Sequence, residues 1–346
     1  NPLDIVEEYG ADALRFTLIS MAAPGRDIKL ATSRVEGYRN FTTKLWNAAR
    51  FCEMNECVVS HNYDPTSAVQ TVNKWIIGEV AKAKLEIDRS LAAYRFNDAA
   101  SAVYQFVWGT FCDWYLELAK PLFGSDDDAA KEETRLVAGW TLAQILKLMH
   151  PFTPFVTEEI WEKLGDNPEQ LLITSDWPEY GEELVDVDAF NEMEWVIGLI
   201  SGIRSVRSEM NVPPSAKVPM ILNEGTEEAK AWLKGHMLLI SRLARVSEAS
   251  TDVEPPKGAL EFVHSGATIA LPIADVIDLE QEKARLEKAI KKAEGELKKI
   301  SGKLSNEKFL ANAPDAVVEE NKARLAAEQD ACDKLKASLD KILAAM

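Results

Sequence analysis

The feature that most constrains the fold is a heptad repeat in the C-terminal segment 276–346. Apolar positions there alternate in steps of three and four residues. The first run comprises Val276, Leu279, Lys283, Leu286, Ile290, Ala293, Leu297, Ile300 and Leu304, and the second comprises Val318, Leu325, Cys332, Leu335, Leu339 and Ile342. A short loop containing Pro314 separates them. Two such helices bury their seams against each other, so we predict an antiparallel coiled-coil hairpin with arms of roughly 40 Å.

The first 172 residues show helical periodicity almost throughout. Apolar residues recur at steps of three and four in segments 33–54, 69–90, 96–120 and 134–149. Asp12 follows Gly10 and is expected to cap the helix that begins there. Thr153 and Pro154 are typical of a helix start with proline at the first position. We therefore expect an antiparallel bundle of about five helices.

The middle of the chain has a mixed pattern. A helix is predicted over 187–210, followed by a strand at 217–222, a helix at 227–243, and two strands at 260–263 and 268–273 around the turn Ser265-Gly266. The fold class is thus mainly α: an antiparallel helical bundle, then a small α/β module over 211–275, then the C-terminal antiparallel coiled-coil hairpin over 276–346.

Composition limits the possible function classes. Of 346 residues, 47% are hydrophobic and 27% are charged, which indicates an ordinary globular protein without membrane spans. The first twenty residues carry acids where a signal peptide has a basic region, so no signal peptide is expected. Four cysteines without a C-x-x-C pair predict free thiols in a reducing cytosol and no metal site.

The net charge of −17 is unevenly distributed. Segment 278–346 holds 14 basic and 14 acidic residues, so the preceding 277 residues hold 25 basic against 42 acidic and carry the whole excess. Phosphate contacts require positive potential. A nucleic-acid partner would therefore have to use the C-terminal hairpin or a local basic patch.

No catalytic constellation stands out. The four histidines lack metal-ligand spacing, and no glycine-rich phosphate loop occurs. The pair Glu158-Glu159 follows a helix start, where acids complement the helix dipole, and 126–128 reads as an acidic turn. The aromatic stripe over 106–115 has helical spacing and is expected to pack in the core.

Two features suggest RNA binding, and each has a structural alternative. Segment 44–51 (KLWNAARF) places Arg50 and Phe51 near a helix end, which suits phosphate contact and base stacking; an ordinary C-terminal turn with a core phenylalanine explains it equally well. The second feature is a set of lysines on the first hairpin helix, which could follow a sugar-phosphate backbone or simply form a solvated face with Glu-Lys pairs. These lysines are Lys288, Lys291, Lys292, Lys298, Lys299 and Lys303.

Several stretches, in this order, resemble class I aminoacyl-tRNA synthetases of the valine, isoleucine and leucine subgroup. The stretches are NPLD (1–4), YGADALR (9–15), KLWNAARF (44–51), YRFNDAA (94–100), CDWYLE (112–117) and HPFTPFVTEEIW (150–161). Two further stretches, IRSVRSEMNVPP (203–214) and KFLANAP (308–314), together with the terminal hairpin, resemble the bacterial valyl members of that family. The resemblance covers essentially the whole chain and implies a C-terminal fragment.

The resemblance implies a tRNA-binding role. In the family, the whole enzyme joins valine to its tRNA with ATP and Mg; this chain has no His-x-Gly-His signature and starts after the Lys-Met-Ser-Lys-Ser loop, so catalytic and editing sites are expected to be missing. Residues 1–32 would end the catalytic core and 33–210 would form the anticodon-binding bundle. The resemblance implies that Arg50 and Phe51 bind the anticodon loop, with Arg34 and Lys44 as neighbouring contacts. We expect a monomer that binds valine-accepting tRNA and no cofactor; the alternative is a coiled-coil interaction protein without an RNA role.

Overall fold

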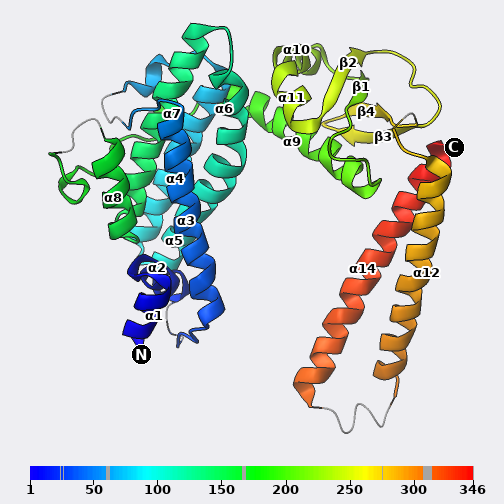
Figure 1. Ribbon diagram of the computed structural model, residues 1–346, viewed down its shortest axis with the longest axis horizontal. Helices are drawn as coiled ribbons and strands as arrows, with labels where there is room; N and C mark the ends of the chain where they lie inside the picture. The colour runs from blue at the N-terminus through cyan, green and yellow to red at the C-terminus, as the bar shows by residue number, and fades with distance from the viewer. Residues whose placement is uncertain are drawn as a thin grey trace. The chain divides into compact units, whose positions relative to one another are not determined.

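The structure is a computed structural model that describes residues 1–346 except 24, 26, 60–62, 166–168, 275, 307–313 and 346. The chain divides into two compact units, Asn1–Glu194 and Trp195–Met346 (Figure 1). Helices dominate the first unit, while the second holds a small sheet and a long helix pair (Figure 1). The predicted mainly α fold class is confirmed.

The first unit is a helical bundle. Its helices are α1 (Pro2–Tyr9), α2 (Ala11–Met21), α3 (Thr32–Met54), α4 (Thr71–Ala92), α5 (Phe96–Gln105), α6 (Leu116–Phe123), α7 (Asp128–Met149) and α8 (Pro154–Leu164). Short 3-10 turns lie at η1 (Pro65–Ser67), η3 (Leu172–Thr174) and η4 (Glu182–Leu184). α7 is the central helix, since every residue from Val137 to Leu146 is buried. A helix buried around its whole circumference must have neighbours on all sides.

Two helices differ from their predicted bounds. α7 begins six residues before the expected position 134, because the carboxylate of Asp127 accepts hydrogen bonds from the backbone N–H groups of Ala129 and Ala130 and so caps an earlier start. The predicted single helix over 96–120 is interrupted by the π-helical segment η2 (Phe106–Tyr115) between α5 and α6. Its aromatic stripe packs as expected, with Phe106, Phe111 and Tyr115 buried.

The expectation for Asp12 is wrong. Helix α2 has Gly10 at its N-cap, with no side-chain cap. The carboxylate of Asp12 instead accepts hydrogen bonds from the backbone N–H groups of Phe155 (3.3 Å) and Val156 (2.7 Å), in the first turn of α8. Thr153 does precede α8 with Pro154 in the first turn, but its hydroxyl bonds the carbonyl of Met149 and leaves the cap to Asp12.

The second unit contains the small α/β module. After α9 (Val187–Glu209) come β1 (Val218–Asn223), α10 (Glu227–Gly235), α11 (Met237–Ala244), β2 (Val246–Thr251), β3 (Ala259–His264) and β4 (Ala267–Pro272). The sheet order is β2-β1-β4-β3, with β1 parallel to β2 and the other pairs antiparallel. The predicted helix over 227–243 breaks at His236, and strand β2 was not predicted. Only Val246 of β2 is fully buried, so this edge strand lacks the apolar alternation that indicates a strand.

Two local features fix the hairpin of β3 and β4 and its position on α9. Ser265 and Gly266 have positive φ values of 49° and 82°, the conformation that a two-residue type I′ turn requires. Helix α9 approaches the hairpin at two glycines: a Cβ on Gly198 would lie 2.6 Å from the ring of His264, and one on Gly202 would lie 2.6 Å from the ring of Phe262. The sheet therefore packs directly against the helix backbone.

The C-terminal hairpin consists of α12 (Leu279–Leu304) and α14 (Asp315–Ala345), which lie side by side (Figure 1). The predicted seam is present, with Ile290, Ala293 and Cys332 buried at its centre. Lys336 of α14 pairs with Glu294 of α12 at 2.8 Å. Most of the KFLANAP stretch lies outside the described residues. Within the described part of the chain, no helix is both long and apolar enough to cross a membrane.

Candidate RNA-binding surfaces

The C-terminal turns of α3 present the first candidate surface. Arg50 is exposed, and no hydrogen bond or ion pair joins it to another described residue. The ring of Phe51 is half-buried, with its centroid 6.0 Å from that of Phe123. The Nζ atom of Lys120 lies 5.6 Å from the Phe51 ring centroid. Phe51 is therefore not a core residue, and part of its ring remains open to a ligand.

Arg50 has a second aromatic neighbour that sequence reasoning did not single out. It lines a shallow hollow of about 40 Å³ together with Trp46 and Lys163. The Nζ atom of Lys163 stands 5.0 Å from the Trp46 ring centroid and pairs with Glu159 at 2.8 Å. Three cations and two aromatic rings thus lie at the end of α3 together with three acids: Lys120 pairs with Glu117, Lys163 pairs with Glu159, and Glu53 lines the hollow. Arg50 is the cation of this set without an ion pair to a described residue, and with the rings beside it this suits phosphate contact and base stacking. Lys120 and Lys163 come from α6 and α8, so only the tertiary fold brings them here.

Lys44 and Arg34 are placed differently. The Lys44 ammonium lies 2.5 Å from the Asp113 carboxylate and 3.9 Å from the Trp108 ring centroid, so it already has partners. Arg34 is exposed near the start of α3, sixteen positions before Arg50, which is roughly 24 Å along the helix axis at 1.5 Å per residue. Arg50 and Phe51 follow each other in α3 and have different neighbours: Arg50 lines the hollow with Lys163, and Phe51 packs beside Phe123. Arg34 lies apart from both.

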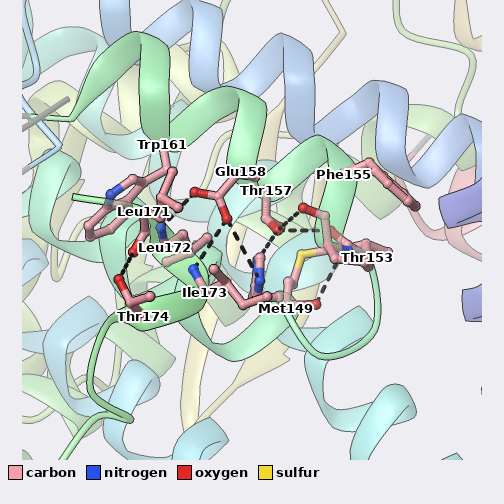
Figure 2. Close-up of polar contacts among 12 residues, drawn as sticks. Met149, Thr153, Phe155, Thr157, Glu158, Trp161, Leu171, Leu172, Ile173 and Thr174 are labelled. Atoms are coloured by element: carbon pink, nitrogen blue, oxygen red, sulfur yellow. Dashed lines mark hydrogen bonds and ion pairs between the residues drawn. The ribbon is translucent and has the colours of Figure 1, made fainter. Parts of the chain in front are cut away.

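Several carboxylates bind backbone N–H groups at helix starts. The carboxylate of Glu158 accepts from Leu172 (2.6 Å) and Ile173 (3.2 Å), at the first turn of η3 (Figure 2). Glu133 of α7 accepts from Val69 and Gln70, just before α4. Both carboxylates therefore have a structural role.

The histidine His150 is partly buried next to this network. The Thr157 hydroxyl donates to the carbonyl of Thr153, so Nδ1 of His150 donates to the Thr157 oxygen at 2.9 Å (Figure 2 shows the threonine pair). Burial lowers the pKa of His150, against the opposing effects of Glu158 and Asp12. Among the described residues, no group of histidine, cysteine and acidic side chains is placed to hold a metal ion.

The hairpin lysines form the second candidate surface. Helix α12 carries eight basic and five acidic residues, while α14 carries five basic and seven acidic, so positive charge gathers on α12. All six predicted lysines are exposed. Lys299 pairs with Glu296 at 2.6 Å, and the other five form no ion pair with a described residue. Lys288, Lys292, Lys299 and Lys303 are spaced by four, seven and four residues, which places them in one stripe on the helix; Lys291 and Lys298 lie on another.

Two stretches of the chain match known family models. Residues 73–222 match the model described as the anticodon-binding domain of tRNA ligase. Residues 278–343 match the valyl tRNA synthetase tRNA binding arm, which corresponds to the hairpin of α12 and α14. The end of α3 lies before the first of these matches.

Curated relatives match almost the whole chain. The valine–tRNA ligase of Caulobacter vibrioides is 48% identical over 345 residues, which is 99% of this chain and 38% of the relative. That of Rhizobium meliloti is 48% identical over 328 residues, covering 94% of this chain and 34% of the relative. The chain thus spans little more than a third of their length. On these matches, the chain belongs to the valine–tRNA ligase family and carries its anticodon-binding domain and tRNA-binding arm.

Proposed function

We propose that this chain binds a valine-accepting tRNA as a monomer. The α3 end cluster, which we define as Arg50, Phe51, Trp46, Lys120 and Lys163, contacts the anticodon loop. The lysine stripe of α12 contacts the sugar-phosphate backbone at the outer corner of the tRNA. Arg34 contributes at the edge of the anticodon surface, and Lys44 holds Trp108 and Asp113 in place beside it.

The observation that carries this proposal is an exposed Arg50 that has no hydrogen bond or ion pair with a described residue, next in the chain to a Phe51 ring that is only partly buried. A guanidinium without a protein partner is available to phosphate, and an open aromatic face is available to a base. The acidic net charge does not oppose this, because α12 has an excess of basic residues and Arg50, at the end of α3, forms no ion pair with a described residue. Many acids of the bundle are occupied elsewhere, as caps and ion-pair partners.

The activity of the longer protein is part of the same proposal. We propose that the full-length protein joins valine to its tRNA with ATP and Mg, in the cytoplasm. Residues 1–32 then end the catalytic core and contact the acceptor stem. Residues 33–210 form the anticodon-binding bundle, 211–275 form a linking module, and 276–346 form the arm. This chain supplies tRNA affinity to that reaction and needs no cofactor for binding.

The test compares Phe51→Ala with Phe155→Ala, which removes a phenylalanine that is 65% exposed at the start of α8. Stacking contributes about 1 to 3 kcal/mol per base, so Phe51→Ala should weaken binding of valine tRNA by ~5-fold or more. Thermal melting of both variants should stay close to that of the unchanged chain. An unrelated tRNA measures specificity.

Three results would contradict the proposal. Equal affinity of the unchanged chain for valine tRNA and unrelated tRNA would remove the specific role. A loss of binding in Phe51→Ala that only follows a loss of folding would return Phe51 to a packing role. A dimer by mass measurement in solution, with no tRNA affinity, would favour the coiled-coil interaction protein instead.

A further inference from the structure

A surface cavity of about 360 Å³ in the second unit is unusually basic. It lies where the last turn of α9, the loop after it and the end of α11 meet. Three arginines, Arg204, Arg207 and Arg245, line it together with Ser208 and Asn211. No acidic side chain of the described residues lines this cavity, which we call the arginine cavity.

Arg207 is the buried member of the three. Its side chain is only 7% exposed. One terminal nitrogen, Nη2, donates to the carbonyls of Pro213 (3.1 Å) and Ala216 (2.8 Å) and so holds the loop after α9. The other, Nη1, is buried and has no hydrogen-bond partner among the described residues. Leaving a buried charged donor unsatisfied is costly, so a group that accepts from Nη1 would bind favourably.

The other two arginines increase the positive potential at the same place. Nε of Arg204 donates to the carbonyl of Leu243 at 2.9 Å, which fixes the guanidinium against the end of α11. Arg245 is exposed and has a left-handed backbone, with φ 58°. Burial, and then the charge of Arg245, lower the pKa of Arg207, so the two guanidinium groups repel each other. The nearby carboxylate of Glu209 is bonded to Ser205 and to Lys341 (2.9 Å) and does not line the cavity.

Helix dipoles explain part of this arrangement. α9 and α11 both end at the cavity, and arginines near helix C-termini are stabilised by the dipole. The loop carbonyls explain why one nitrogen of Arg207 is buried. The dipoles and the loop carbonyls leave one observation unexplained: the second terminal nitrogen of Arg207, Nη1, is buried without an acceptor among the described residues. An anion that accepts from the Arg207 guanidinium explains it.

We propose that the arginine cavity binds one phosphate group, and that this phosphate is a phosphodiester of the bound tRNA. Guanidinium groups match phosphate in charge and geometry, and Ser208 and Asn211 add neutral donors. The tRNA assignment rests on the proposed function. A free phosphate ion could bind the same guanidinium groups, so the experiment measures inorganic phosphate and tRNA separately.

The test variant is Arg245→Asn, because asparagine tolerates the left-handed backbone and removes the charge. The matched control is Arg242→Gln, which removes a charge from the neighbouring helix α11 outside the cavity. Affinity for valine tRNA is measured across a salt series, and melting temperature is measured with and without inorganic phosphate. Removing one phosphate interaction should reduce the salt slope by about 0.7 to 0.9, which corresponds to roughly five- to eightfold in affinity at 0.1 M salt.

We expect Arg245→Asn to bind valine tRNA more weakly and with a smaller salt slope, by the amounts just given. We also expect inorganic phosphate to raise the melting temperature of the unchanged chain and of the control more than that of Arg245→Asn. If Arg245→Asn behaves like the control in both measurements, the cavity is not a phosphate site. If only the phosphate stabilisation is lost, the site takes a free ion and the tRNA assignment is wrong. If the unchanged chain does not bind tRNA at all, the proposed function fails, while the phosphate measurement still decides whether the cavity binds an anion.

Discussion

The carboxylate of Asp12 accepts a 2.7 Å hydrogen bond from the backbone N–H of Val156, 144 positions further along the chain. This bond joins α2 to the first turn of α8. The first turn of a helix has N–H groups without intrahelical partners, and a carboxylate both satisfies them and complements the dipole. The Glu133 carboxylate likewise accepts from a backbone N–H group just before α4, and the Glu158 carboxylate accepts from one at the start of η3. Long-range capping therefore accounts for several acids of a strongly acidic bundle.

We expect Asp12→Ala to destabilise the first unit. Loss of an N-cap costs about 0.5 to 2 kcal/mol, and the backbone N–H groups of Phe155 and Val156 would have no acceptor in its place. Urea unfolding followed by far-UV circular dichroism measures the change. Asp126→Ala is the control, since Asp126 is exposed in the turn before α7. Equal stability of the two variants would show that the cap contributes nothing.

Stability should fall as the pH drops below about 6.5, the ordinary pKa of histidine. His150 has a lowered pKa in the folded state because of burial, so it binds a proton more readily when unfolded. The stability that His150 contributes is therefore complete above the pKa it has in the unfolded chain. It is lost as the pH falls from that value through the lower pKa that His150 has in the folded protein. His150→Asn, which keeps a donor near Thr157, should reduce this pH dependence between about pH 7.5 and 5.5. An unchanged slope in chemical denaturation would show that other groups cause it.

Replacement by alanine should destabilise the protein at Gly139 and stabilise it at Gly295. A Cβ on Gly139 would lie 1.8 Å from the carbonyl oxygen of Val58, so Gly139→Ala must displace backbone and should cost about 1 to 3 kcal/mol or more. Around Gly295, in α12, no described atom outside its chain neighbours and the adjacent backbone of the helix lies within 4 Å of the place that an alanine methyl would take. Gly295→Ala should stabilise the arm by about 0.5 to 1 kcal/mol through helix propensity. Thermal melting distinguishes the two, and a destabilised Gly295→Ala would contradict the open surroundings of this residue.

The lysine stripe of α12 should carry the salt dependence of tRNA binding. Changing Lys288, Lys292 and Lys303 to alanine should reduce the salt slope by about 0.7 to 0.9 for each phosphate that is no longer neutralised. The control changes Lys322, Lys334 and Lys336 of α14, each of which has an acidic partner. A double change of Lys291 and Lys298 tests the other stripe. If all three variants keep the affinity of the unchanged chain, the arm does not bind the tRNA backbone.

The sequence by itself determined the elements with strong local periodicity. The heptads located α12, α14 and their buried seam, because each step of three or four brings a residue back to the same helix face. The same rule located α3, α4 and α9, and the Ser265-Gly266 turn located the hairpin of β3 and β4. The resemblance of several short motifs, in the right order, indicated the family. All of these signals lie within short stretches of chain.

Only the tertiary structure decided which distant groups meet. Asp12 has the pattern of a local cap, and nothing near it in sequence indicates that α8 begins beside it. Strand β2 has one fully buried residue and pairs only because β1 offers an edge. Lys120 and Lys163 reach the end of α3, and Arg245 approaches Arg207, because packed helices bring them there. Hydrogen bonds and charge interactions depend on distance in space, and a sequence records only distance along the chain.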